Sequence, residues 1–127
     1  MGPSLSERIE QLTSRMLRKR LFVVTMTSTA GPEQLMPYLA EHLEYMTELA
    51  RQGVLFASGP FLRADGAPSG DGLSIFNTAT SDEARGFAEK DPFYLHGLRR
   101  FEIKEWMLME GAMRVTLNFA NRTLQVE

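Results

Sequence analysis

The sequence predicts a single α+β domain of the split βαβ, or ferredoxin-like, arrangement, with an extra N-terminal helix and a C-terminal hairpin extension. Two observations predict it. Segments rich in β-branched and aromatic residues alternate with two segments of helical periodicity, in the order β-α-β-β-α-β. The length of 127 residues and a hydrophobic content of 43% suit one globular domain with its own core.

Breaks at glycine and proline, together with the spacing of apolar residues, locate each element of the main domain. In chain order we expect a strand at 21–28, a helix at 33–52, strands at 54–61 and 73–79, a helix at 81–90, and strands at 101–108 and 114–120. Gly53 is expected to end the first of these helices and Ser81 to cap the second. Gly111 is expected in the turn between the last two strands.

Residues 1–20 are expected to form a helical extension, followed by a main domain over residues 21–127 that includes a β extension from about residue 107. Ser4 or Ser6 would cap the helix, and its basic residues would fall in the last turn, where they suit the helix dipole. We therefore expect this helix to pack on the domain or on a partner subunit. The alternative is an arm that binds nucleic acid or a membrane.

The sheet is expected to have one open face. Pro60 cannot donate to a strand ladder, so strand 54–61 is placed at an edge. The glycine-rich segment Gly66–Gly72 is interpreted as a hairpin turn, because it lacks the Lys-Ser/Thr of a phosphate-binding loop and opens no helix. Two helices would cover only one face of the sheet, and an uncovered apolar face usually finds a partner. We therefore expect a homodimer that buries sheet against sheet.

His42 is predicted to point into the core. On a helical projection of residues 33–52 it falls in the middle of the apolar stripe. That stripe consists of Leu35, Leu39, Leu43, Met46, Leu49 and Ala50. A buried imidazole needs a hydrogen-bond partner. The alternative interpretation is a core histidine with a purely structural role.

Asp91 is the second residue that breaks a local rule. Pro92 disfavours α geometry for the residue before it, so the second helix should end near Asp91. The C-terminal end of a helix disfavours a carboxylate, which predicts a cationic or donor partner for Asp91. The alternative is a solvated Asp-Pro turn.

The split βαβ fold can bring His42 and Asp91 together, because it places both helices on one face of the sheet. An aspartate that accepts a hydrogen bond from one imidazole nitrogen fixes the tautomer and leaves the other nitrogen free as a general base. No nucleophile accompanies the pair, so a serine triad is not supported. The sequence therefore predicts a His-Asp pair that can abstract a proton.

Other polar residues are weaker candidates. His96 would supply a third metal ligand beside His42 and Asp91 only if all three converged, and no metal site is predicted. Arg99 and Arg100 are candidates for binding an anionic substrate, but we expect both at a strand entrance that faces solvent.

Composition excludes several classes of protein. The absence of cysteine excludes a disulfide framework, a thiolate zinc site, an iron–sulfur cluster and a cysteine nucleophile. A net charge of −2 gives no general attraction to nucleic acid or anionic lipid. The longest purely apolar run, Leu21–Val24, is too short for a bilayer span or a signal-peptide core. We therefore expect a cytoplasmic protein with neither nucleic acid nor a membrane as partner.

Taken together, these segments resemble the YciI-like (YCII-related) family of the dimeric α/β-barrel superfamily. The resemblance covers residues 21 to about 106, or two thirds of the chain. The matching pieces are the strand 21–28, the helix segment Tyr38-Leu-Ala-Glu-His42-Leu, the tripeptide Ser58-Gly59-Pro60, and Asp91-Pro92-Phe93 with Gly97 following. The first helix and the tail after residue 106 depart from the minimal family pattern.

The resemblance implies a ferredoxin-like protomer that pairs into a barrel, with an active site built around a histidine and an aspartate. These catalytic roles fall on His42 and Asp91, and Ser58, Gly59 and Phe93 are implied as substrate-binding residues. The family includes a dehydrochlorinase that acts on a chlorinated hydroxyhydroquinone, and similar folds include muconolactone isomerase.

Two hypotheses for function follow. The first is a cofactor-independent lyase or isomerase for a small cyclic or aromatic compound. In it His42 takes a proton, Asp91 orients the imidazole, and the Ser58-Gly59 region holds a substrate oxygen. The second is a dimeric domain that binds a small ligand, or serves as an accessory subunit, without turnover. A nucleic-acid binder that uses the basic first helix is disfavoured.

Overall fold

A computed structural model describes residues 1–127, which divide into two compact units. The larger unit spans residues 20–107, and the smaller combines residues 1–19 with residues 108–127. The elements of the main fold are β1 (Lys19–Ser28), α2 (Pro32–Leu35), the 3-10 turn η1 (Met36–Tyr38), α3 (Leu39–Arg51), β2 (Leu55–Leu62), β3 (Pro68–Phe76), α4 (Ser81–Glu89), α5 (Pro92–Leu95) and β4 (Arg99–Leu108).

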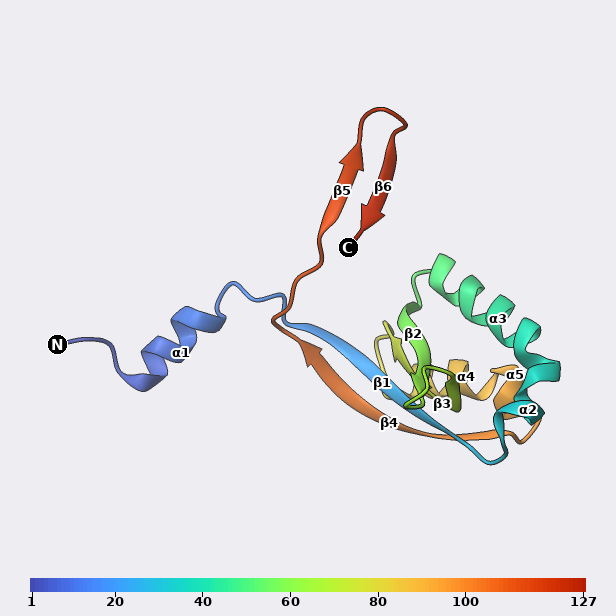
Figure 1. The fold of residues 1–127 in the computed structure, drawn as a ribbon. Helices are drawn as coiled ribbons and strands as arrows, with labels where there is room; N and C mark the ends of the chain where they lie inside the picture. The colour runs from blue at the N-terminus through green and yellow to red at the C-terminus, as the bar shows by residue number, and fades with distance from the viewer. The chain divides into compact units, whose positions relative to one another are not determined.

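The four long strands form one sheet in the order β2-β3-β1-β4, in which β3 runs antiparallel to both β1 and β2. This is the strand order of the ferredoxin-like fold, so the predicted fold class is confirmed. β2 lies at an edge, as Pro60 predicts. Figure 1 shows β1 and β4 side by side along the curved sheet, with α3 and α5 on its concave side.

The core lies between one face of the sheet and the helices α3 and α4. Phe22 of β1 stands opposite Phe76 of β3 in the strand register, and both side chains are buried. The whole buried cluster consists of Phe22, Val24, Met26, Met46, Leu49, Phe76, Ala84 and Ala88. The contribution of α4 is the small side chains Ala84 and Ala88, which let its backbone approach the sheet closely.

Proline divides the helix that the sequence predicts over residues 33–52. Pro37 has no backbone N–H with which to continue an α-helical ladder. Residues 36–38 therefore form the tighter turn η1 between α2 and α3. The predicted end is confirmed, because Gly53 follows α3 with a φ of 78°, a left-handed conformation that glycine adopts without strain.

The glycine-rich segment is only partly the predicted turn. The chain reverses by Ala67, whose carbonyl accepts the Arg63 N–H at 2.7 Å. From Pro68 onward the backbone belongs to β3, with Gly72 opposite Pro60 of β2. Glycines disfavour a strand by themselves, but here pairing with strands on both sides outweighs that preference.

Helix caps explain two further differences from the predicted elements. The cap of α4 is Thr80 rather than Ser81, since the Thr80 hydroxyl accepts the Glu83 N–H at 3.1 Å. The single-turn helix α5 is not predicted from the sequence. It begins with Pro92 in the first position, where the missing N–H of proline breaks no hydrogen bond.

The smaller unit contains α1 (Leu5–Thr13), which Ser4 caps by a reciprocal capping box with Glu7. The prediction of basic residues in its last turn is wrong. The helix ends at Thr13, and Arg18 beyond it has a φ of 52°, a left-handed conformation that no helix continues. None of the helices combines the length and apolarity needed to cross a membrane.

The smaller unit also contains a hairpin of two short strands, β5 (Val115–Asn118) and β6 (Thr123–Val126). The sequence predicts a fifth strand at 114–120, joined to strand 101–108 by a turn at Gly111, but β5 is shorter and does not pair with β4. β5 pairs with β6 in a separate two-stranded sheet, with Val115 opposite Val126 and Leu117 opposite Leu124.

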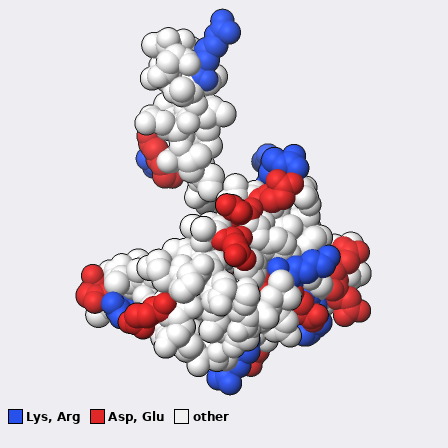
Figure 2. All heavy atoms as spheres, turned by 90° about the vertical axis from the view of Figure 1, so that its right-hand side faces the viewer, with Lys and Arg blue, Asp and Glu red and all other residues white.

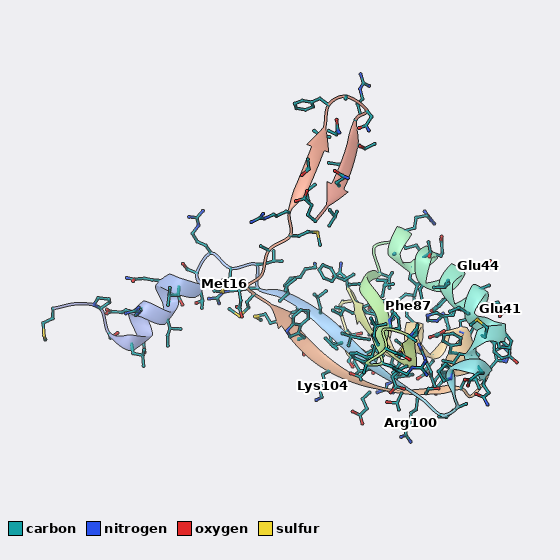
Figure 3. The ribbon with its side chains drawn as sticks, viewed as in Figure 1. Met16, Glu41, Glu44, Phe87, Arg100 and Lys104 are labelled. Atoms are coloured by element: carbon teal, nitrogen blue, oxygen red, sulfur yellow. The ribbon has the colours of Figure 1, made fainter.

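The sheet face without helices is mixed in character. On the central strands Val23 stands opposite Ile75, and Thr25 opposite Leu73. On β4 the exposed Arg100 and Lys104 point away from the helices, as Figure 3 shows. The apolar character expected for this face is therefore found on β1 and β3, while β4 presents charges.

The core assignment predicts a large stability loss for Phe76→Ala. Phe76 is only 1% exposed, and truncation of such a side chain costs about 3–5 kcal/mol of unfolding free energy. The matched control is Phe119→Ala at an 88% exposed position, which should change stability by less than about 1 kcal/mol. Urea denaturation measures both. Equal effects of the two substitutions would contradict this core.

Candidate active site

His42 and Asp91 are in direct contact inside the larger unit. The distance from His42 Nδ1 to Asp91 Oδ1 is 2.7 Å. Only 9% of His42 and 3% of Asp91 is exposed. His42 comes from the inward stripe of α3, as its helical position predicts. A carboxylate in this place accepts the Nδ1–H and leaves Nε2 as the free nitrogen of the ring.

Asp91 is held in position by a second helix terminus, which the sequence pattern does not indicate. α4 ends at Glu89, and Asp91 is already the N-cap of the next helix, α5. Its Oδ1 accepts the Phe93 N–H at 3.1 Å. A carboxylate is favourable at the N-terminus of a helix. The unfavourable position expected from the sequence, at the C-terminus of α4, does not apply. The predicted hydrogen-bond partner exists, and the alternative of a solvated turn is wrong because Asp91 is buried.

Phe93 holds the plane of the imidazole. The rings of Phe93 and His42 are stacked, with centroids 4.3 Å apart and 18° between their planes. His96 takes part in a different stack, on Tyr38 with centroids 3.8 Å apart. No three side chains of His, Cys, Asp and Glu are grouped so as to hold a metal ion. The three-ligand arrangement considered for His96 is therefore not formed.

A cavity of about 740 Å³ opens beside the imidazole. His42, Ser58, Gly59 and Phe93 all line it, and Asp91 lies behind His42 outside the lining. The apolar part of the wall comes from α2, α3 and β2, chiefly Leu35, Leu39, Leu43, Met46, Leu55 and Phe56. The Ser58 hydroxyl, on the strand side of the wall, is 2.8 Å from the hydroxyl of the fully buried Ser74. A mostly apolar cleft of this size with a few polar groups is typical of a small-molecule site.

The expectation that Arg99 faces solvent is wrong. Arg99 is only 9% exposed and lines the same cavity. β4 begins two residues earlier than the predicted strand, and its alternation puts Arg99 on the inner face with Phe101 and Ile103. Extending the alternation of Phe101 and Ile103 backwards along the sequence would have found this position. Arg100 is exposed, as expected.

Tyr45 joins α3 to α4 by a hydrogen bond. Its hydroxyl donates to the Phe87 carbonyl at 2.6 Å. Burial raises the pKa of Tyr45 to about 12, with a smaller contribution from the negative charge of Asp91. The phenol therefore stays neutral and acts as a donor. The sequence places Tyr45 beside the apolar stripe but does not indicate this bond.

The outer surface around the site shows no strong field of one sign. In Figure 2, which presents the side of the molecule that is on the right in Figure 1, acidic and basic side chains are intermixed. Glu41 and Glu44 lie on the outer side of α3 in Figure 3. The groups available for chemistry are therefore those inside the cavity.

The fold and this site define a ferredoxin-like domain with a candidate acid–base centre. Residues 21–107 match the YCII-related domain family, and the chain belongs to that family. Among curated protein sequences, none matches the chain.

A similar solved structure is that of the 5-chloro-2-hydroxyhydroquinone dehydrochlorinase from Burkholderia phenoliruptrix AC1100, in complex with 2,5-dihydroxybenzoquinone. The two chains are 26% identical, and the TM-score is 0.59. The match covers 68% of this chain and 92% of the dehydrochlorinase.

The raised pKa of Tyr45 predicts its titration. Tyr45 should ionise only as the pH approaches 12, instead of near the usual value of 10.0. Because the neutral form is favoured in the folded state, its stabilising effect is complete below pH 10 and is lost as the pH rises toward 12. The difference in tyrosinate absorbance between the wild type and Tyr45→Phe isolates this group. A difference curve centred near pH 10 would contradict the burial.

Proposed function

We propose that this protein is a cofactor-independent lyase or isomerase that acts on a small cyclic or aromatic compound. The observation that carries the proposal is the 2.7 Å contact between His42 and Asp91 at the wall of an apolar cavity. A buried carboxylate that holds Nδ1 gives the imidazole one free nitrogen and a fixed orientation. This arrangement suits transfer of a proton.

In the proposed reaction, Nε2 of His42 removes a proton from a carbon or hydroxyl of the substrate. The electron pair of the broken bond forms a new π bond, and in a lyase reaction a leaving group departs with its own electron pair. In an isomerase reaction the proton returns to another atom of the same substrate. Asp91 orients the imidazole and stabilises the imidazolium while it carries the proton.

The other lining residues would position the substrate. Ser58 would bind a substrate oxygen through its hydroxyl, which the buried Ser74 holds in place, and Gly59 contributes backbone to the cavity wall. Phe93 keeps the imidazole plane fixed. Positioning the substrate in this way supplies rate enhancement beyond what a general base alone provides.

The similar dehydrochlorinase suggests where to look for the substrate. Its substrate and its bound ligand are hydroxylated or quinonoid six-membered rings. A cavity of about 740 Å³ has room for such a ring, and its apolar wall suits the ring faces. We therefore propose oxygen-substituted rings as the substrate class, with 5-chloro-2-hydroxyhydroquinone as the first compound to assay.

Replacement of the proposed base tests the function. His42→Ala should lower kcat/KM by about 10²–10⁴-fold, because it removes general-base assistance. Asp91→Asn can still cap α5 through its amide oxygen, and it should lower kcat by a smaller factor. Glu41→Gln, on the exposed side of the same helix, is the matched control and should leave the rate unchanged.

Chloride release from the chlorinated ring, or loss of its ultraviolet absorbance, provides the assay. Full activity in a folded His42→Ala variant would exclude His42 as the base. If the compound binds and is recovered unchanged from the wild type, the protein is a ligand-binding domain without turnover, which is the second hypothesis.

We also propose that the protein forms a homodimer through the open sheet face, where Val23, Leu73 and Ile75 present apolar surface. Sedimentation should give about twice the protomer mass of 14.3 kDa. Ile75→Glu should produce monomers, because it places a charge in that apolar surface. The control Glu41→Gln should remain dimeric. A monomeric wild type at micromolar concentration would refute this arrangement.

A further inference from the structure

Arg99 is held rigidly at the start of β4, next to the proposed reaction site. Its Nε and Nη2 donate to the Gly70 carbonyl at 3.2 and 2.9 Å. Nη1 is 3.6 Å from the sulfur of Met26. The guanidinium carbon lies 4.6 Å from the centre of the Phe93 ring. These contacts orient the group at the cavity wall, which Arg99 lines.

The positive charge of Arg99 has no ion-pair partner. No carboxylate oxygen lies within 4.0 Å of it, and the two nearest aspartates are engaged elsewhere. Oδ1 of Asp91 contacts the His42 ring and accepts the Phe93 N–H. Oδ1 of Asp71 accepts the Ser28 N–H at 2.8 Å. A guanidinium has five N–H donors, and one carbonyl and one thioether do not saturate them.

A buried cation without a counter-charge is costly unless something compensates for the lost hydration. Burial lowers the pKa of Arg99, and the charges of Asp91 and Asp71 offset this in part. An arginine side chain nevertheless keeps its proton in proteins. The charge therefore persists at the cavity wall.

The glycine-rich part of β3 makes room for this charge. A Cβ built on Gly72 would lie 3.1 Å from the Gly59 carbonyl and 3.6 Å from Nη2 of Arg99. Gly70 has a φ of 97°, which a residue with a side chain rarely adopts. The segment therefore packs closely against the guanidinium. The role of the glycine-rich segment Gly66–Gly72 is to hold Arg99 in position.

We propose that Arg99 binds an ionised oxygen of the ligand, so that the cavity selects ring compounds that carry a carboxylate or a phenolate-type oxyanion. The proposal rests on the proposed function only for the assignment of this cavity as the substrate site. The guanidinium offers parallel donors to a planar oxyanion, and a charge-assisted hydrogen bond at a mostly apolar wall is stronger than one in bulk water. Arg99 is thus the specificity-determining residue, while His42 handles the proton.

Two matched pairs of probes test the proposal by binding alone. Benzoate is compared with neutral benzamide, and 2,4-dinitrophenolate with neutral 2,4-dinitroaniline, by NMR chemical-shift titration of the whole chain at pH 7 and low salt. At least one anion should bind about tenfold or more tightly than its neutral counterpart, and the better pair identifies the oxyanion. Equal affinity within both pairs would overturn the proposal.

Variants assign the effect to Arg99. Arg99→Gln should abolish the preference for the anion while binding of the neutral probe is unchanged. Arg51→Gln, at a solvent-exposed arginine outside the cavity, is the matched control and should keep the preference. An anion preference that survives in a folded Arg99→Gln variant would refute the role of Arg99. If that variant does not fold, the comparison of probes in the wild type decides.

The outcome is separable from that of the proposed reaction. His42→Ala should lose turnover but keep the preference for the anion, because binding does not use the base. An Arg99-dependent preference without turnover of any ring compound would sustain this proposal and defeat the proposed reaction. Turnover that depends on His42, with a KM that Arg99→Gln leaves unchanged, would support the proposed reaction and refute the role of Arg99.

Discussion

The burial of one imidazole against one carboxylate is the constraint around which the site is arranged. His42 and Asp91 belong to helices that follow different strands, and their side chains meet only because both helices pack on the same face of one sheet. Both side chains are buried, and Nδ1 of His42 and Oδ1 of Asp91 satisfy each other by a hydrogen bond. The contact therefore joins the packing of the core to the chemistry of the cavity.

Much of this arrangement follows from sequence patterns, and the rest depends on contacts that no local pattern contains. The apolar stripe of α3 puts His42 inside, and Pro92 marks the position at which Asp91 must stand, so both can be predicted. The charge of Arg99 favours the surface, although the alternation of Phe101 and Ile103, extended back to residue 99, places it on the inner face. Likewise Gly72 becomes part of a strand because neighbours pair with it on both sides, which propensity does not reveal.

Charge is distributed unevenly between the surface and the cavity. On the face that Figure 2 shows, acidic and basic side chains are intermixed, and surface pairs such as Arg51 with Glu48 contribute little to stability. Inside, one cation and one anion lie in a region of low polarity, each held by a backbone group as well as by a side chain. Salt screens these interior charges less than the pairs on the surface.

Asp91 uses a single oxygen, Oδ1, both to begin α5 and to hold the imidazole. Whatever unwinds that one helical turn also releases the ring, since the two hydrogen bonds share an acceptor. Part of the cavity wall is built differently: Leu43 and Phe56 line the cavity, are exposed and take no part in the buried core. Substitutions at these two positions would therefore change the room available in the cavity without removing a side chain from the buried core.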